Sequence, residues 1–517
     1  MSEEIRKNKL FIPVFLYSLA SFLSKISGYL RDLFLAAFMG TSVLSDIFFI
    51  AFRFPYSFRR ALSEESLNPA FIPIFVKVSD LEDKNLKYEF TRKIFLIFFF
   101  ISAFITIFVE IFMPQILSIF SYGFKDSVQQ EILITTSRII FPYLVFLALT
   151  AVLMANLNAN NKFGASGGIP SVLNLTLVLA IYFFTFYGDN KLTFLAWSVL
   201  IGGFFQILIL FLLVEREFWN VLFRFKRFHT SLKSFYNLYW PTLLYSSFFQ
   251  INLLIGIFLC SFQEGAVSYI YYAERLFYLP LTLIGIAIGV VLVPNLSNYL
   301  RNDNKSLASD YMNRAYKYAL MTILPLTGFL LALSSEIVSL LFERGEFTSK
   351  STINTSLVLN AFLIGLPAAT MAKVFTPYFF AIEKPKIFLK VSTYANIINL
   401  VTMLILFYFM GFFGIPIALS ISSFVLIFFL IKEHKKKDFF NFSKIQIREL
   451  LKYLFLSLII YIVSNEINST NYIKEAGLVF AVSISGIVSV LIFSFFIFIF
   501  DRNLYNQIIK VISNKFS

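Results

Sequence analysis

Six stretches of this chain contain no aspartate, glutamate, lysine or arginine over a length sufficient to cross a membrane: Phe163–Gly188, Leu192–Val214, Ser234–Gln263, Leu276–Leu300, Ser351–Ala372 and Ala476–Phe500. A helix needs about 20 mostly apolar residues to span the hydrocarbon core of a bilayer. A seventh run, Val391–Ile431, is long enough for two crossings, and Gly411, Gly414 and Pro416 in its middle predict a turn. These runs predict a multi-pass membrane protein.

The composition supports this class and excludes others. Hydrophobic residues make up 58% of the chain and charged residues only 14%, and the mean hydropathy is +0.77. A water-soluble fold cannot bury so large an apolar fraction, and disordered or collagen-like chains have far fewer aromatic residues than the 19% found here. Cys260, the single cysteine, cannot form an internal disulfide. Together with the two histidines, His229 and His434, it cannot build a four-ligand zinc site without heavy use of carboxylates. We therefore expect no metal and no cofactor.

Shorter apolar runs, and a long charged helix at the start of each half of the chain, complete the set of predicted elements. We predict an all-α polytopic membrane protein with 14 transmembrane helices at about residues 10–38, 44–76, 92–120, 131–158, 167–187, 192–214, 234–261, 266–298, 311–342, 352–381, 388–410, 414–432, 450–465 and 475–500. The stretch that follows Met1 resembles a signal peptide, but no small-residue cleavage site follows it, so we interpret it as a retained first helix.

The distribution of basic residues predicts the orientation. Connections on the side of the N-terminus carry 31 lysines and arginines, whereas the opposite connections carry only 5. Because basic residues concentrate on the cytoplasmic side, this asymmetry places both termini in the cytoplasm. A net charge of +14 would suggest a nucleic-acid partner in a soluble protein. In a membrane protein the topology accounts for this charge, so we expect no nucleic-acid partner. We also expect the protein to be a monomer.

The two halves of the chain contain similar motifs. Pro142 and Asn174 are separated by the same interval as Pro367 and Asn399, and Ala51-Phe-Arg53 matches Ala273-Glu-Arg275 at nearly the same offset. An internal repeat of this kind is typical of transporters that bind substrate at the interface between their repeats. We predict two pseudo-repeated six-helix bundles, a lobe over residues 1–215 and a lobe over 216–437, followed by two C-terminal helices within 438–517.

Eight basic residues fall inside the predicted helices: Lys25, Arg31, Arg53, Arg59, Arg60, Arg138, Arg275 and Lys373. Each charge near the bilayer centre costs roughly 2.5–3.5 kcal/mol, so such side chains should face carboxylates, water or one another. For Arg59, Arg60, Arg138 and Lys373, the alternative is that they extend from helix ends toward the interface.

The basic residues of helices one, two and eight fit an anionic ligand. The seven-residue spacing puts Lys25 and Asp32 on nearly one helix face, and Ser24 and Arg31 likewise. Helices one, two and eight carry six bases, five of them arginine, whose planar fork suits phosphate. Their acids, Asp32, Asp46, Glu64, Glu65 and Glu274, are candidate ion-pair partners or gates.

Catalytic motifs are missing from the sequence. It contains no P-loop, no Gly-x-Ser-x-Gly motif and no paired histidines, and the predicted outward connections are too short to hold a soluble active site. We therefore expect a transporter rather than an enzyme.

Several motifs in order along the chain resemble the MurJ/MviN lipid II flippase family. They are Ser24-Lys-Ile-Ser-Gly-Tyr-Leu-Arg-Asp32, Ser45-Asp-Ile-Phe-Phe-Ile-Ala-Phe-Arg-Phe-Pro55, Arg59-Arg-Ala-Leu-Ser-Glu64, Asn68-Pro-Ala-Phe-Ile-Pro73, Gln250-Ile-Asn-Leu-Leu-Ile255, Tyr271-Tyr-Ala-Glu-Arg275, Leu341-Phe-Glu-Arg-Gly345 and Gly365-Leu-Pro367. The resemblance implies a member of the multidrug/oligosaccharidyl-lipid/polysaccharide exporter superfamily in the bacterial plasma (inner) membrane. It further implies outward transfer of lipid II, the undecaprenyl-pyrophosphate-linked peptidoglycan precursor.

The resemblance also assigns roles to residues. It implies a central cavity lined by Arg31, Arg59 and Arg275 with Asp32 beside them, to which the helix positions add Lys25, Arg53 and Arg60. Ser24 and Glu64 match a thin outward gate, and Asp46 matches a further functional acid. Helices 13 and 14, within residues 438–517, match a groove for the lipid tail. Membrane lipids and cell-wall synthesis proteins are the other partners implied.

Some positions depart from the family pattern. Lys25 replaces a usual arginine, and Glu65 replaces a usual glycine. Gly256 and Met403 stand where some members have acidic sodium ligands, so we expect this sodium site to be degenerate. The alternatives are a flippase for another polyprenyl-pyrophosphate oligosaccharide or a multidrug exporter of the same superfamily, for which we would expect intramembrane acids without so many arginines.

Overall fold

The computed structural model describes residues 3–62, 64–79, 86–120, 122–124, 126–187, 190–216, 218–219, 231–436, 444–470, 477–502 and 505–506. Nearly all of these residues are helical, and these ranges contain no strand. The predicted all-helical fold is therefore confirmed. Contacts divide the chain into two compact units, Met1–Ser268 with Arg344–Phe347 and Tyr269–Glu343 with Thr348–Ser517. The predicted lobes 1–215 and 216–437 stay a prediction.

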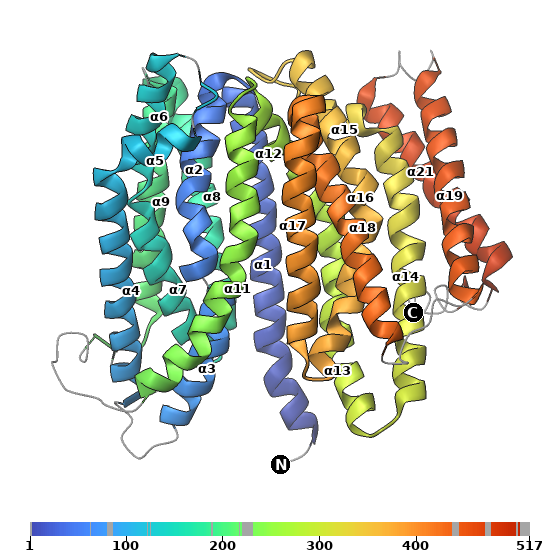
Figure 1. The fold of residues 1–517 in the computed structure, drawn as a ribbon, viewed down its shortest axis with the longest axis horizontal. Coiled ribbons are helices and arrows are strands. Elements are labelled where there is room, and N and C mark those ends of the chain that lie inside the picture. Colours follow the sequence, from blue (N-terminus) through green and yellow to red (C-terminus); the bar gives the residue numbers. More distant parts are fainter. Residues whose placement is uncertain are drawn as a thin grey trace. The chain divides into compact units, whose positions relative to one another are not determined.

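The first unit contains upright helices that run side by side (Figure 1). They are α1 (Glu3–Met39), α2 (Val43–Leu62), α3 (Glu64–Ser79), α4 (Leu86–Ile111), α5 (Met113–Phe120), α6 (Ser127–Ile140), α7 (Tyr143–Ala159), α8 (Phe163–Tyr187), α9 (Lys191–Leu213), α11 (Ser231–Cys260) and the first residues of α12 (Ala266–Pro280).

The second unit begins within α12 and continues through a short π-helical turn, η1 (Leu281–Ile286). Its other elements are α13 (Ala287–Arg301), α14 (Lys305–Ala332), α15 (Ser334–Phe342), α16 (Ser349–Ala381), α17 (Pro385–Met410), η2 (Gly411–Phe413), α18 (Gly414–Lys435), α19 (Lys444–Ser469) and α21 (Leu478–Phe500). The predicted turn at Gly411 is confirmed, because η2 separates α17 from α18 and Gly411 has a φ of 60°.

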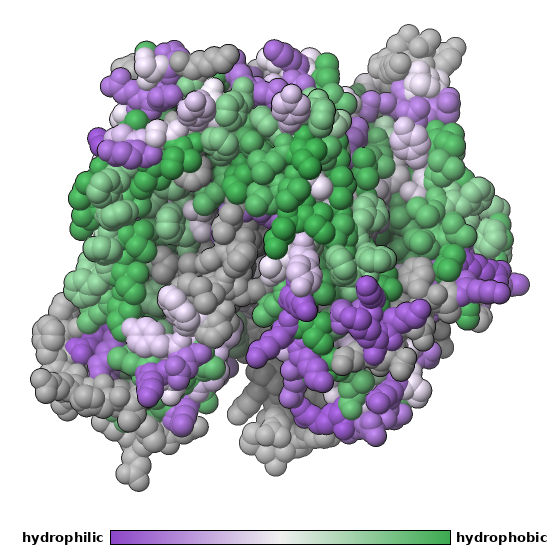
Figure 2. Space-filling model, in the orientation of Figure 1, coloured by the Kyte–Doolittle hydropathy of each residue, from purple (hydrophilic) through white to green (hydrophobic). Residues whose placement is uncertain are grey.

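The described helices include ten runs that are long and apolar enough to cross a membrane. One of them, Pro385–Lys435, is 51 residues long and contains both α17 and α18. In each unit, apolar side chains cover the middle of the helices while hydrophilic ones gather toward the ends (Figure 2). This is the surface of a multi-pass membrane protein, because lipid tails contact the apolar band and water contacts the ends.

Two predicted helices of the first unit are divided in the structure. The segment predicted at 92–120 forms α4 and α5, which are separated at Phe112, and the segment 131–158 forms α6 and α7, separated at Phe141 and Pro142. A proline lacks the N–H that a helix interior needs, and its ring clashes with the carbonyl four residues earlier. Pro114 and Pro142 explain both breaks. The predicted helix 44–76 likewise corresponds to α2 and α3, on either side of residue 63.

Helices α1 and α8 pack closely because α8 presents glycines to α1. A Cβ built on Gly167 would lie 2.8 Å from the Ser21 Oγ and 2.9 Å from the Tyr17 carbonyl oxygen, distances that no real side chain tolerates. Small residues of this kind allow helix backbones to approach each other within membranes. The close contact brings polar side chains of the two helices within hydrogen-bonding distance.

The segment Arg344–Phe347 packs against the end of α1. The Glu346 N–H donates to the Ala37 carbonyl over 2.9 Å, and the Lys191 ammonium lies 3.0 Å from the Glu346 carboxylate. Gly345 has a φ of +58°, and a Cβ there would meet the Ala37 carbonyl oxygen at 2.2 Å. Only glycine fits this position, because it combines a left-handed backbone with a close approach.

Candidate functional site

Arg31 and Asp32 form a buried ion pair on α1. The Arg31 Nη2 and Nε donate to the Asp32 Oδ1 over 2.7 and 3.0 Å. The two residues are 7% and 1% exposed. The Arg31 guanidinium also lies 6.0 Å from the centre of the Phe52 ring on α2, within the range of a cation–π contact. A buried charge of this kind requires a partner, and Asp32 supplies it.

Asn174 on α8 completes this cluster. Its Oδ1 accepts a hydrogen bond from the Arg31 Nη1 over 2.8 Å. Its Nδ2 donates to the Ser27 Oγ over 3.1 Å and to the Ser24 carbonyl over 3.3 Å. Sequence reasoning used Asn174 only as a marker of the repeat and missed this contact. The signal that could have found it is a polar amide in the middle of a charge-free run.

The other candidates on α1 and α2 lie in different surroundings. Lys25 is exposed while Asp32 is buried, so the two do not share one environment despite their seven-residue spacing. Ser24 is buried, and Arg53 is half-buried. The side chains of Arg59, Arg60 and Glu64 lie outside the described residues. The structure therefore brings together Ser24, Arg31 and Asp32 among the sequence candidates of this unit.

Asp46 is fully buried in the first turn of α2 and accepts three hydrogen bonds. They come from the Gly265 N–H over 2.7 Å, the Ser268 N–H over 2.8 Å and the Ser268 hydroxyl over 2.5 Å. These donors belong to the start of α12, where backbone N–H groups have no partner within their own helix. Asp46 thus acts as a helix cap supplied by a different helix.

Arg275 belongs to the second unit. Its guanidinium lies over the ring of Tyr271, 4.5 Å from the ring centre, one turn earlier on α12. Arg275 and its neighbour Glu274 are both half-buried. The aromatic face of Tyr271 makes a cation–π contact with this guanidinium in a partly shielded place.

The positions expected to form a degenerate sodium site are apolar. Gly256 on α11 is buried, and Met403 on α17 is 2% exposed. Within the described ranges, no three His, Cys, Asp or Glu side chains gather closely enough to hold a metal ion.

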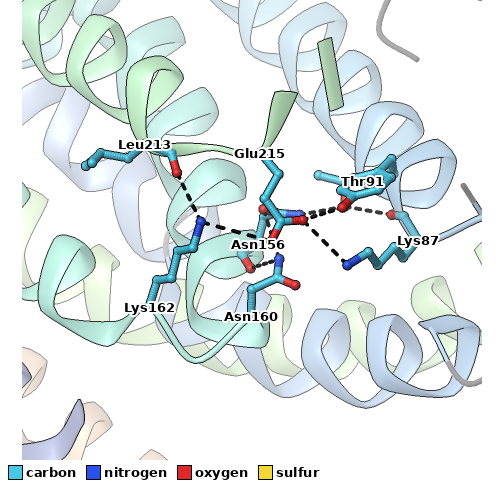
Figure 3. A network of polar contacts seen from close by, with 8 residues as sticks. Lys87, Thr91, Asn156, Asn160, Lys162, Leu213 and Glu215 are labelled. Atoms are coloured by element: carbon cyan, nitrogen blue, oxygen red, sulfur yellow. Dashed lines mark hydrogen bonds and ion pairs between the residues drawn. The ribbon is translucent and has the colours of Figure 1, made fainter. Parts of the chain in front are cut away.

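A polar network at one end of the first unit was missed by sequence reasoning (Figure 3). Glu215, just after α9, accepts a short hydrogen bond from the Tyr88 hydroxyl on α4. The ammonium groups of Lys87 and Lys162 lie 3.5 and 4.0 Å from the same carboxylate. The network links the ends of α4, α8 and α9.

Arg92 lies further along α4. Arg92 is 4% exposed, and α4 begins at Leu86, more than one helical turn before the predicted start at residue 92.

The network around Glu215 predicts a pH-dependent stability. Burial opposes ionisation of this carboxyl, but the Tyr88 hydroxyl and the two ammonium groups outweigh it and hold its pKa below the usual value. A lowered pKa contributes stability above the unfolded-state pKa that is lost as the pH falls through the folded-state value. We expect the melting temperature of detergent-solubilised protein to fall below pH 5 by about 1–2 °C more than that of Glu215→Gln. Equal pH profiles for the two proteins would contradict this role of Glu215.

The family model described as "Lipid II flippase MurJ" matches residues 35–476. The chain belongs to the MurJ lipid II flippase family. A probable lipid II flippase MurJ of Rhizobium tropici is 32% identical over 404 residues, which cover 77% of this chain and 76% of that protein. Its counterpart in Rhizobium meliloti (strain 1021) is 34% identical over 382 residues, covering 72% and 71%. Members of the MurJ family are transporters, and this chain is one of them.

Solved structures agree with the MurJ assignment. A structure described as "Lipid II flippase MurJ, inward closed conformation" matches with a TM-score of 0.81 at 26% identity, covering 95% of this chain and 99% of that one. An inward-facing multidrug-resistance MATE transporter matches with a TM-score of 0.68 at 16% identity, covering 80% and 94%. The MATE likeness shows a shared fold alone.

Proposed function

We propose that this chain transfers lipid II from the inner to the outer leaflet of the bacterial plasma membrane. The observation that carries the proposal is a guanidinium, Arg31, held inside the helices of a chain that matches the MurJ family over residues 35–476. A diphosphate-linked lipid needs a cationic site within the membrane, and arginine supplies the planar fork that phosphate prefers.

The proposal includes the topology predicted from the sequence. Fourteen transmembrane helices form two six-helix bundles and a C-terminal pair, with both termini in the cytoplasm. The excess of basic residues, 31 against 5, supports this orientation. Under this topology the Glu215 network lies on the cytoplasmic side, and residues 438–517 contain the groove for the lipid tail.

The transport cycle follows from the charges. Lipid II enters sideways from the inner leaflet, and its pyrophosphate is neutralised by Arg31, Arg59 and Arg275 while its prenyl tail stays in lipid. Lys25, Arg53 and Arg60 add positive charge along the path. Closure of the cytoplasmic side then exposes the head group outward, past a gate that includes Ser24 and Glu64.

The membrane potential favours outward movement of this substrate. One elementary charge crossing 100 mV corresponds to roughly 2.3 kcal/mol, so two negative charges leaving a negative interior gain about 4–5 kcal/mol. No nucleotide hydrolysis is required. Because Gly256 and Met403 offer no carboxylate, we propose that sodium does not drive transport through those positions.

The test uses bacterial cells depleted of their own lipid II flippase. Expression of this chain should restore accessibility of the lipid II head group at the outer surface and sustain growth. As a control for membrane insertion, Arg138→Ala removes an exposed basic side chain of α6 and should restore both equally. Failure to restore head-group accessibility, with the protein present in the membrane, would reject the proposed substrate. Another polyprenyl-pyrophosphate oligosaccharide would then be tested as cargo.

A further inference from the structure

We propose that Asn174 is a positioning residue that fixes the guanidinium of Arg31 for an anionic head group. The inference rests on the proposed function for its ligand, but its structural part concerns only α1 and α8. Both helices belong to the first unit, and their close packing has been described above.

The contacts of Asn174 tie three points of α1 together. Its amide oxygen holds the Arg31 Nη1 at 2.8 Å, and its amide nitrogen donates to the Ser27 hydroxyl and the Ser24 carbonyl. The Ser27 hydroxyl in turn donates to the Ser24 carbonyl over 2.8 Å. Because an amide is planar, fixing its nitrogen at two acceptors also fixes its oxygen. The position of the Arg31 fork is therefore set from α8.

Asp32 and Asn174 hold Arg31 from different sides and with different charge. Asp32 binds Nε and Nη2, whereas Asn174 binds Nη1. An arginine side chain has many rotamers, and Asp32 accepts both bonds at the single atom Oδ1, about which the guanidinium can pivot. A neutral amide adds a second fixed point without further neutralising the cation. A second carboxylate at this place would orient Arg31 equally well but would cancel its attraction for a pyrophosphate.

The backbone of α1 leaves room for this amide. A Cβ built on Gly28 would lie 3.3 Å from the Asn174 Nδ2, closer than an ordinary contact. Asn174 cannot retreat without lengthening its hydrogen bonds to Ser27 and Ser24, because the same nitrogen atom makes both. Gly28 is thus a second residue on which the position of Arg31 depends.

The test is a double-mutant cycle on purified protein, with fluorescent lipid II as the probe. Asn174→Ala should weaken lipid II binding about tenfold, the effect of losing one hydrogen bond to a charged group. Arg31→Ala should weaken binding about 100-fold, and the double variant should bind no more weakly than Arg31→Ala alone. The matched control is Asn158→Ala. Asn158 is a similarly buried amide of the first unit that accepts from Ser166 over 2.6 Å, and its loss should change affinity less than twofold.

Two results would overturn the inference. One is equal affinity for Asn174→Ala and Asn158→Ala. The other is a further tenfold loss when Asn174→Ala is added to Arg31→Ala, since that effect could not act through Arg31. Asn174→Asp should bind lipid II at least as weakly as Asn174→Ala, because it adds a negative charge beside the cation.

A measurement without ligand separates this inference from the proposed function. If the wild-type protein binds no lipid II, the proposed function fails. The melting temperatures of the wild type, the two single variants and the double variant still show whether Asn174 and Arg31 are energetically coupled. A positioning contact predicts that Asn174→Ala lowers the melting temperature less in the Arg31→Ala background than in the wild type. Additive shifts would reject it.

A glycine pair provides a second, milder test. Gly28→Ala should displace Asn174 and weaken lipid II binding severalfold. Gly168→Ala lies at the same helix interface, where its new methyl would make an ordinary contact of 3.8 Å with Ala20, and should leave binding unchanged. Equal affinities for the two variants would contradict the role given to Gly28 and Asn174.

Discussion

Replacing Arg31 by alanine is expected to abolish growth of cells that depend on this chain for lipid II transfer. The substitution removes the cation that is fixed between Asp32 and Asn174. It also leaves the Asp32 carboxylate, which is 1% exposed, without this ion-pair partner. Breaking a buried pair in this way costs about 3–5 kcal/mol, so loss of function could come from loss of charge or from loss of stability. The measurement is complementation of a flippase-depleted strain together with the amount of protein in the membrane.

A double substitution separates the two causes. Arg31→Ala with Asp32→Asn removes both charges of the ion pair, so the buried carboxylate is no longer left without Arg31 and the membrane level of the protein should recover. If the cation itself binds the substrate, growth should still fail. Growth of the double variant at a wild-type rate would show that Arg31 only neutralises Asp32, and the transport role of Arg31 would have to be given up.

The sequence predicted the helical fold well where chemistry leaves no choice. Charge-free runs such as Leu192–Val214 can satisfy their backbone in lipid only as helices, and α9 follows that run closely. The breaks at Phe112 and Pro142 were missed because the hydropathy is uniform across them. A proline kinks some membrane helices and ends others, and the sequence does not reveal which of these occurs.

The start of α4 was missed for a related reason. Lys87 makes the residues before position 92 resemble a polar connection, although α4 begins at Leu86. The aliphatic stems of such residues pack against neighbouring helices, and Arg92 is buried. The charged residues therefore led to a predicted connection that is too long and a predicted helix that starts too late.

In the candidate site, contacts between residues close in sequence were predictable, whereas contacts between residues far apart in sequence were not. Arg31 and Asp32 are adjacent on one helix, so their pairing was within reach of sequence reasoning. Asn174 is 143 positions from Arg31 and Glu215 is 127 positions from Tyr88, and no spacing rule connects such residues. For Asp46 the motif resemblance gave a functional role, but only the fold shows that the carboxylate caps α12.

Asp46→Ala is expected to lower the melting temperature of the detergent-solubilised protein by about 5–10 °C. The carboxylate accepts from the Gly265 N–H, the Ser268 N–H and the Ser268 hydroxyl. Without it both N–H groups would lose their acceptor within a buried site, whereas the hydroxyl keeps its contact with the Ser45 hydroxyl. Each such loss costs about 1–3 kcal/mol. Asp46→Asn should show an intermediate shift. Its amide keeps one acceptor oxygen, but its NH2 group replaces the other oxygen and faces a group that is itself a hydrogen-bond donor.

The matched control is Asp126→Ala. Asp126 also caps a helix of the first unit, because its side chain accepts from the Val128 N–H over 2.9 Å at the start of α6, but it is exposed. Water replaces an exposed cap, and its removal costs only about 1 kcal/mol. The difference between the melting-temperature shifts of the two variants therefore reports the effect of burying the cap, since both variants lose a helix cap. If Asp46→Ala melted within about 2 °C of Asp126→Ala, the buried cap would not stabilise the start of α12, and a role for Asp46 in transport alone would have to explain its place in the motif.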